Sequence, residues 1–228
     1  MKIAKQEVTL LDHMGTDLSV VNAARVSFHK TSDFEYDLKH DGRCNERLKE
    51  SDVKLVNYLA KHSHWSPFAH TSITFRIKAP IFVARQLVKH QVGGVWNEVS
   101  RRYVSDEPEF YLPDVWRGKP ENAKQGSSDK VIDELDFKGM GPAESTQDCL
   151  NTYNNMLYNG VAPEQARMVL PQNTMTEWWW TGSLVFFARV CKQRLDSHAQ
   201  QETQEVAQLI NKAIEPLFPV SWKALMNE

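Results

Sequence analysis

The fold of this chain is decided by the stretch from His70 to Tyr103, HTSITFRIKAPIFVARQLVKHQVGGVWNEVSRRY. Its first part alternates apolar and polar residues, as a half-buried strand does, and the apolar ones are Ile73, Phe75 and Ile77. Pro80 ends this strand and suits the first turn of a helix, for which residues 81–91 have the apolar spacing. The glycine pair at 93–94 breaks this helix. The stretch therefore predicts a strand that leads directly into a helix.

The rest of the chain alternates predicted strands and helices without an internal repeat. A strand is predicted at Lys2–Leu11. Helices are predicted at residues 17–24, 51–61 with Ser51 as the cap, 142–158, 163–169, 177–193 and 199–216, the last with a capping box at 197–200. Residues 117–130 are polar and predict a surface loop. These elements predict an α+β fold over residues 1–228, with an antiparallel sheet and a helical C-terminal half.

Composition narrows the class of protein. The chain has 228 residues and 41% hydrophobic content, enough for the core of one domain or of two small ones. Its 27 Lys+Arg and 29 Asp+Glu give a formal charge of -2, without the basic surplus that binding to nucleic acid or to an anionic membrane needs. The N-terminus lacks the apolar core of a signal peptide, and no apolar run could span a membrane. We therefore expect a cytoplasmic protein with no nucleic-acid or membrane partner.

Cysteine and histidine do not indicate a metal site. Cys44, Cys149 and Cys191 are far apart and outside any C-x-x-C pattern, so we expect reduced thiols. His62, His64 and His70 crowd one turn, but no carboxylate or cysteine accompanies them. They are interpreted as surface and strand-end histidines, and no metal is expected.

An extended NEVSRRYV segment after the glycine pair would present Glu98, Ser100 and Arg102 on one side. Such a row suits a nucleotide, because hydroxyl and guanidinium groups hold phosphate and a carboxylate accepts from a sugar or a base. The backbone N–H groups at the glycine pair could bind another anion. The alternative is an exposed strand whose charges face water.

Two further clusters also allow both a structural and a ligand-binding interpretation. Glu164 and Arg167 lie three residues apart on a short predicted helix, where they form either a structural salt bridge or an arginine fixed toward a phosphate. Arg194, Asp196 and His198 lie in a polar break between two helices, where cations could meet an anionic ligand at a helix N-terminus.

Taken together, these stretches resemble the flavin-dependent thymidylate synthase family, which makes dTMP without a cysteine nucleophile. The family pattern N-E-x-S-x-R-Y is matched at residues 97–103. Further matches, in family order, are AARVSF at 23–28, the histidine turn at 64–70, APIFVARQ at 79–86, EQARMVLP at 164–171 and RLDSHAQ at 194–200.

The chain departs from this family in the Arg-His-Arg triplet, which here is Lys89-His90-Gln91. Lysine lacks the planar fork of arginine and glutamine lacks its charge, so we expect weaker contacts to flavin and to anions. Eight residues instead of seven separate Gln91 from Ser100, and Ala69 replaces the usual glutamate of the histidine turn.

The resemblance implies reductive methylation of dUMP, with methylenetetrahydrofolate as carbon donor and FAD, reduced by NADPH, as hydride source. By the same resemblance, the dUMP site comprises Gln86, Glu98, Ser100, Arg102, Arg167 and Arg194, with Arg167 and Ser100 toward the phosphate and Arg194 against the uracil ring. The FAD neighbours are Ser27, Ser66, Lys89, His90, Gln91 and His198, and His64 lies near the folate side. The residues closest to the chemistry are thus Arg194, Ser100 and His64. The implied fold is a central antiparallel sheet flanked by helices, in a homotetramer with active sites between subunits.

Two other functions stay open at this point. A flavin-binding relative could have lost methyl transfer or could act on another pyrimidine nucleotide, given the altered triplet. A single-stranded nucleic-acid module could stack bases on Trp65, Trp96 and the triplet at 178–180, although the net charge of -2 argues against it.

Overall fold

A computed structural model describes residues 1–38, 44–121, 126–134 and 137–227. In chain order the strands are β1 (Lys2–Ile3), β2 (Glu7–Met14), β3 (Glu35–Leu38), β4 (Cys44–Arg47), β5 (Ser72–Pro80), β6 (Gly94–Glu98), β7 (Glu109–Phe110), β8 (Trp116–Arg117), β9 (Val131–Ile132) and β10 (Met175–Gly182). The α-helices are α1 (Asp17–Arg25), α2 (Glu50–Lys61), α3 (Ile81–Leu87), α4 (Pro142–Tyr158), α5 (Pro163–Ala166), α6 (Leu184–Arg194), α7 (Gln201–Ile214) and α8 (Pro219–Met226). Short 3-10 helices are η1 (Val26–Phe28), η2 (Ser66–His70) and η4 (Arg167–Val169).

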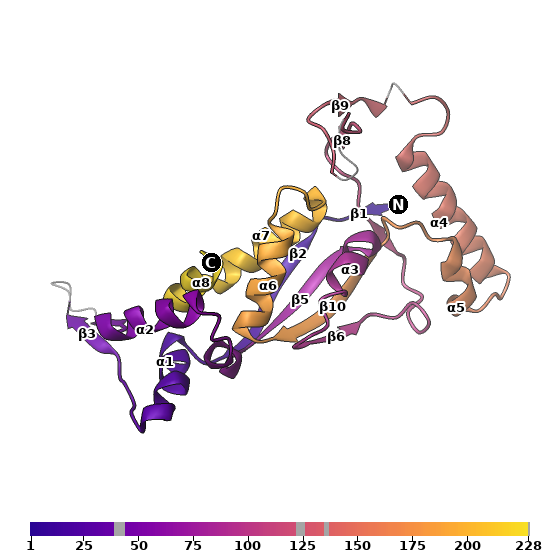
Figure 1. The fold of residues 1–228 in the computed structure, drawn as a ribbon. Coiled ribbons are helices and arrows are strands. Elements are labelled where there is room, and N and C mark those ends of the chain that lie inside the picture. The colour runs from indigo at the N-terminus through magenta and orange to yellow at the C-terminus, as the bar shows by residue number, and fades with distance from the viewer. Residues whose placement is uncertain (39–43, 122–125, 135–136, 228) are drawn as a thin grey trace.

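The central sheet has the order β2-β5-β10-β6, and every neighbouring pair in it is antiparallel (Figure 1). Trp178 of β10 lies opposite Ile77 of β5 on one side and Glu98 of β6 on the other. The α+β fold with a central antiparallel sheet is therefore confirmed, and the strand that leads through Pro80 into a helix is its second strand from the edge.

The predicted helix at 177–193 is wrong in its first third, because β10 occupies Met175–Gly182 and α6 begins only at Leu184. Trp178 and Trp180 are 1% exposed, whereas Trp179 is 56% exposed, so the tryptophans alternate between the two faces of the sheet. A run of aromatic residues is compatible with either element, and aromatic packing on a pleated surface favours the strand here. Ser183 then caps α6 by accepting from the backbone N–H of Phe186 at 3.4 Å.

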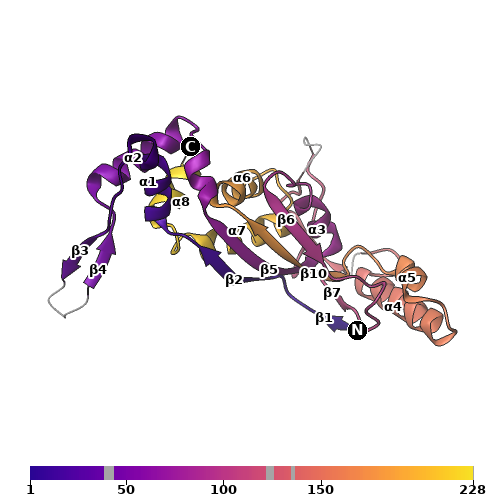
Figure 2. The same ribbon diagram turned by 90° about the horizontal axis from the view of Figure 1, so that it is seen from below.

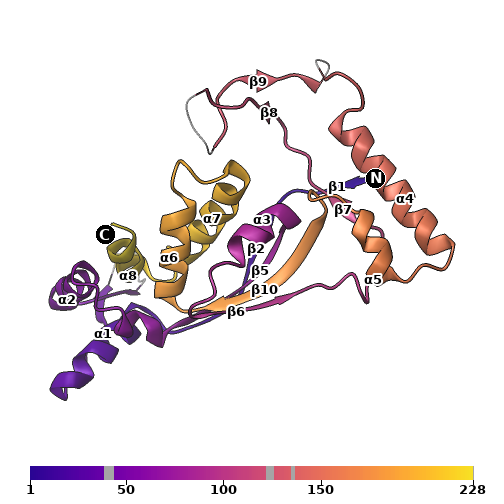
Figure 3. The ribbon, with the colours of Figure 1, turned by 45° about the vertical axis from the view of Figure 1, so that its right-hand side comes forward.

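One face of the sheet is covered by α3, α6 and α7 and forms the main core (Figure 3). Trp96 stacks on Trp178 with ring centroids 4.3 Å apart, and Phe75 meets Phe187 edge to face at 5.2 Å. The opposite face carries exposed Trp179. The two faces of the sheet therefore differ, because α3, α6, α7 and the loops that join them lie on its buried face.

Several helix boundaries also differ from the predictions. Helix α2 begins at Glu50 with Lys49 as its N-cap, so Ser51 is not the cap. Helix α3 ends at Leu87, which leaves the 89–91 triplet outside it. Gln200 is the N-cap of α7, so the capping box predicted at 197–200 is wrong, and that helix ends at Ile214.

The strand predicted at Lys2–Leu11 is divided into β1 and β2, and β2 runs on to Met14. Helix α8 was not predicted. Its N-terminus depends on a residue far away in sequence, because the carboxylate of Asp17 accepts from the backbone N–H groups of Val220 and Ser221 at 2.9 and 2.8 Å.

Helices α4 and α5 lie at one end of the molecule, away from α1, α2 and α8 (Figure 2). They share a small second core, which contains Phe110, Leu150, Tyr153 and Ala166. The predicted loop at 117–130 begins with the last residue of β8 and ends just before β9, and its residues 122–125 lie outside the described parts. No helix in the described ranges is long and apolar enough to cross a membrane.

Candidate active site

The loop after α3 packs against α6 because two glycines face one phenylalanine ring. A Cβ atom at Gly94 would lie 2.7 Å from Cε2 of Phe186, and one at Gly182 would lie 2.8 Å from Cγ of the same ring. Carbon atoms do not approach so closely, so both positions require glycine. Gly93 has a left-handed φ of 86° and forms the turn itself. The glycine pair thus places residues 88–93 against α6.

Three residues meet between α3 and the C-terminal end of α6. Arg194 donates from Nε to Nε2 of His90 at 2.9 Å and from Nη2 to the backbone oxygen of Gln86 at 3.0 Å. The Gln86 side chain donates to Gln200 at 2.6 Å and accepts from Thr203 at 3.2 Å. The half-buried guanidinium of Arg194 is therefore held in one orientation.

The histidine in this group is neutral at pH 7. Burial, with Arg194 and then Arg189 nearby, lowers the pKa of His90 to about 4. Because Nε2 accepts from Arg194, the single proton of the neutral ring lies on Nδ1. Burial also lowers the pKa of Arg194, but an arginine remains cationic at this pH. The pair therefore carries one positive charge rather than two.

A cavity of about 980 Å³ adjoins this group. It is lined by Gln86, Arg194 and His198, and by the first residues of α7. The exposed His198 bonds to Asp196, whose Oδ1 accepts from the backbone N and from Nδ1 of His198 at 2.8 Å each. These bonds lower the pKa of Asp196. The polar break between two helices, predicted as an anion site, therefore opens into a cavity at the N-terminus of α7.

A second cavity, of about 850 Å³, is lined in part by Val92 and Gly93 of the loop. His64, Trp65 and Phe68 line it together with Gly93 and Arg189. The His64 ring lies 6.0 Å from the ring of Tyr58. This cavity has an aromatic wall and a cation, whereas the first is mainly polar.

The predicted row of Glu98, Ser100 and Arg102 on one strand face is wrong. Strand β6 ends at Glu98, and residues 101–103 form a turn in which the Ser100 backbone oxygen accepts from the N–H of Tyr103 at 3.0 Å. The Ser100 hydroxyl accepts from the N–H of Arg102 at 3.3 Å. A hydroxyl that bonds its own backbone competes with the extended conformation, which explains the turn.

The turn nevertheless brings the predicted phosphate contacts together. Glu164 does not pair with the Arg167 side chain through its carboxylate. Its Oε2 lies 3.5 Å from Nε of Arg102, and its backbone oxygen accepts from Nε of Arg167 at 3.3 Å. Both arginines are exposed. Glu164 thus holds two guanidinium groups near each other, an arrangement suited to an anionic group.

The other predicted site residues fall into several separate groups. Glu98 accepts from Thr176 at 2.7 Å and from Trp96 Nε1 at 3.1 Å. Lys89 and Gln91 are exposed beside His90, and Ser66 begins η2 two residues after His64. Ser27 is exposed in η1, whose neighbour Arg25 pairs with buried Asp52. In the single chain these residues form separate groups, and their roles stay predictions.

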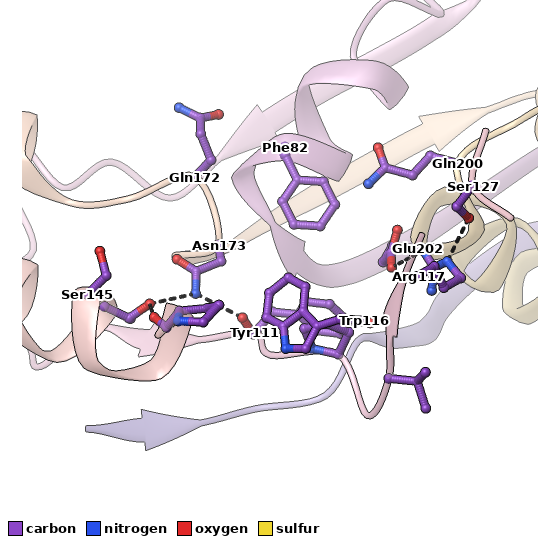
Figure 4. Close-up of a pocket in the computed structure, with 14 residues that line it drawn as sticks. Phe82, Tyr111, Trp116, Arg117, Ser127, Ser145, Gln172, Asn173, Gln200 and Glu202 are labelled. Carbon is purple, nitrogen blue, oxygen red and sulfur yellow. Dashed lines mark hydrogen bonds and ion pairs between the residues drawn. The ribbon is translucent and has the colours of Figure 1, made fainter. Parts of the chain in front are cut away.

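A third cavity, of about 470 Å³, adjoins the first through Gln200, which lines both (Figure 4). Phe82 and Tyr111 meet edge to face in it, with ring centroids 6.2 Å apart. Arg117 closes it with bonds to Ser127 at 2.8 Å and to Glu202 at 2.6 Å. Helix α7 thus contributes to two neighbouring cavities from its first turn.

Thiols and metal ligands are not part of these groups. Cys191 is buried, and burial raises its pKa to about 12. The side chain of Cys44 lies outside what the structure describes. Among the described residues, no group of three or more His, Cys, Asp and Glu side chains is placed to hold a metal. The burial of Trp178 and Trp180 also removes two of the tryptophans that a base-stacking surface would need.

Comparison with known proteins finds similarity over almost the whole chain. Residues 9–220 match the family model described as thymidylate synthase complementing protein. A flavin-dependent thymidylate synthase from Kosmotoga olearia is 37% identical over 99% of this chain and 92% of its own. The chain belongs to the flavin-dependent thymidylate synthase family. A second member, from a strain of Thermus thermophilus, is 37% identical over 95% of this chain and 74% of its own.

A solved structure supports the fold of this family member. The UMP/dUMP methylase PolB from Streptomyces cacaoi, in a crystal with 5-Br dUMP, superposes with a TM-score of 0.78 and 27% identity. The match covers 100% of this chain and 97% of PolB. The resemblance stated from the motifs is thus confirmed, and the protein is an enzyme of this type.

Sequence reasoning missed the residues that hold the predicted ones. Gln200 and Thr203 fix Gln86 from more than a hundred residues away, and Arg189 and Lys192 line the second cavity. The i, i+3 spacing of the two cations was a usable signal. The direction in which these two side chains point could not be predicted, because the helix that carries them was predicted to begin seven residues too early.

Proposed function

We propose that this enzyme converts dUMP to dTMP by reductive methylation, with methylenetetrahydrofolate as carbon donor and FAD, reduced by NADPH, as hydride source. The observation that carries this proposal is the Arg194 guanidinium, held by His90 and Gln86 at the edge of a cavity of about 980 Å³. A fixed cation in a partly buried position stabilises negative charge that develops on pyrimidine oxygens. Neutral His90 orients it without adding a competing charge.

The nucleotide has two sets of proposed contacts. Arg194 and Gln86 bind the uracil side. Ser100, Arg102 and Arg167 bind the phosphate, because both arginines lie beside Glu164 and are exposed, and the Ser100 hydroxyl bonds the backbone of Arg102. Glu98, fixed by Thr176, accepts from the sugar or base. That PolB was crystallised with 5-Br dUMP supports a pyrimidine nucleotide as the substrate.

The cavity of about 850 Å³, which Val92 and Gly93 of the loop after His90 line, fits a flavin dinucleotide. Its ring system needs a flat apolar or aromatic wall, which the exposed Trp65 offers, and its diphosphate needs cations, which Arg189 and Lys192 offer. Lys89, His90, Gln91, Ser66, His198 and Ser27 are the proposed FAD neighbours. When bound and reduced by NADPH, the flavin would supply the hydride that completes the methyl group. His64, in the cavity with the aromatic wall, is proposed on the folate side.

The separation of the two nucleotide-binding groups in one chain supports a homotetramer with active sites between subunits. Arg194 lies at the C-terminal end of α6, where it bonds His90 and Gln86, whereas Arg102 follows β6 and pairs with Glu164 of α5, in the part of the molecule that carries α4 and α5 (Figure 3). A partner chain would supply one of the groups. We also propose that the enzyme acts in the cytoplasm.

The test is an assay of dTMP itself, with purified enzyme, dUMP, FAD, NADPH and methylenetetrahydrofolate. Omitting each component in turn should abolish product, and replacing dUMP by UMP measures how strictly the sugar is recognised. Formation of dTMP without added or bound flavin would refute the proposed hydride source. Oxidation of NADPH without any methylated product, from folded and flavin-loaded protein, would support a relative that has lost methyl transfer.

A further inference from the structure

Two cations of α6 face the loop that follows the altered triplet. Arg189 and Lys192 lie three residues apart on one helix, so they share a face of it. Both are exposed, and both line the cavity of about 850 Å³ that contains Gly93 and His64. The loop itself, at 89–91, retains one cation where the family pattern has two guanidinium groups. Cations are thus present beside the loop, on another element.

Arg189 contacts this loop directly. Its Nη2 donates to the backbone oxygen of Val92 at 2.5 Å, and its charge is one of those that lower the pKa of His90. A Cβ at Gly93 would lie 3.6 Å from Nη2, so the bare glycine backbone lets the guanidinium lie against the turn. A guanidinium has five N–H donors in a planar fork. One bond to Val92 leaves donors available for an anion.

The surroundings strengthen any charge contact made there. Phe68, Ala69, Val185 and Leu225 line the same cavity and are apolar. An ion pair beside such a surface is screened less than one in open water. Arginine also holds phosphate oxygens in a bidentate fashion that neither lysine nor glutamine can reproduce.

We propose that Arg189, assisted by Lys192, supplies from α6 the anion-binding charge that the family's triplet supplies from the loop, and that it binds the diphosphate of FAD. This inference rests on the proposed function, because it takes FAD as the ligand. It changes the expectation from the sequence. The 89–91 triplet alone predicts weakened flavin binding, whereas a guanidinium moved to α6 preserves the affinity and makes it depend on Arg189.

The experiment compares FAD with riboflavin, which has the same ring system and no phosphate. Both are titrated into wild-type protein and into Arg189→Gln, Lys192→Gln and Lys212→Gln variants at fixed ionic strength, with flavin fluorescence as the readout. Lys212 is an exposed cation of α7 and is the charge-matched control. The dissociation constant for FAD should rise about tenfold or more in Arg189→Gln, since charged hydrogen bonds are the strong ones. The riboflavin constant should not change.

A smaller rise in the dissociation constant for FAD is expected for Lys192→Gln, and no rise for the Lys212→Gln control. Added salt should weaken FAD binding more steeply in the wild type than in Arg189→Gln, because the lost contact is a charge contact. If Arg189→Gln does not fold, Arg189→Ala replaces it, since alanine is the best helix former for an exposed position of α6.

Three results would overturn the inference. Unchanged FAD affinity in the Arg189 variant would show that Arg189 does not bind FAD. An equal loss of FAD and riboflavin affinity shows that Arg189 supports the ring or the fold rather than the anion. A wild-type protein that binds neither flavin, while folded, refutes the proposed function as well, so the two failures are distinguishable.

Discussion

The close approach of Gly182 to Phe186 gives a stability prediction that can be worked from distances. A methyl group at residue 182 would lie 2.8 Å from Cγ and 2.9 Å from Cε1 of the ring. The ring cannot retreat, because Phe186 is 1% exposed and packs edge to face on Trp180 at 5.4 Å and on Phe187 at 5.0 Å. Overpacking of a tight core lowers the free energy of unfolding by about 1–3 kcal/mol. Because three ring atoms would be in contact, the loss for Gly182→Ala should lie near the upper end of this range.

The assay is urea unfolding of a double-mutant cycle. Truncating the ring alone, in Phe186→Ala, should cost about 3–5 kcal/mol through the cavity it leaves. In the double variant the new methyl group occupies part of that cavity, so the combined loss should be smaller than the sum by about 1 kcal/mol or more. Protein concentration is held constant, because assembly would add to the apparent stability.

Gly141→Ala is the control for this cycle. Residue 141 has a φ of −76° and no heavy atom within 4 Å of its added Cβ, so the change should cost only about 1 kcal/mol or less, from the poorer N-cap that alanine makes for α4. Additive losses in the cycle, or a Gly182→Ala protein as stable as wild type, would refute the argument that the Phe186 ring packs too closely on Gly182 to admit a methyl group.

Three other changes test the site itself. Arg167→Ala should raise the KM for dUMP about tenfold or more, because a charged phosphate contact is lost; an unchanged KM would remove Arg167 from the nucleotide site. Folding lowers the pKa of His90 to about 4, so as the pH falls below about 6.5 the unfolded protein takes up a proton at this residue before the folded protein does. The contribution of His90 to the free energy of unfolding should therefore fall as the pH drops from about 6.5 toward 4. Thermal unfolding of His90→Gln over that range should show a shallower pH dependence, and an identical slope would contradict the assignment. Replacing Cys44, Cys149 and Cys191 together by alanine should leave dTMP synthesis largely intact, and loss of activity in folded, flavin-bound protein would contradict a cysteine-free mechanism.

Much of the fold was predictable where one physical signal dominates locally. The alternation of Ile73, Phe75 and Ile77 predicted β5, and the apolar spacing after Pro80 predicted α3. Helix α4 was predicted at its observed bounds, because a proline opens it and Gly160 follows its end. The Trp178–Trp180 run failed because three adjacent apolar residues have no period, so only the pairing with β5 and β6 decides their state.

The site was predictable in its residue types and not in its arrangement. The pattern at 97–103 indicated nucleotide contacts, but the Ser100 hydroxyl turns the chain and Glu164 receives Arg102 from a distant segment. The support of Gln86 by Gln200 joins residues 114 positions apart. Contacts of that range follow from the packing of α3 on α7, and no local pattern in the sequence encodes them.

The arrangement of the two nucleotide-binding groups predicts that neither subunit works alone. Strand β6 runs from Gly94, beside α6, to Glu98, and four residue steps of about 3.3 Å separate those ends by about 13 Å. If one site combines Arg194 of one chain with Arg167 of another, then Arg194→Ala and Arg167→Ala subunits should complement each other when they are co-expressed. Random assembly leaves about a quarter of the sites with both arginines intact, so dTMP synthesis should return to roughly that fraction although each variant alone is impaired. A mixture no more active than its separate components would place both arginines in the site of a single chain.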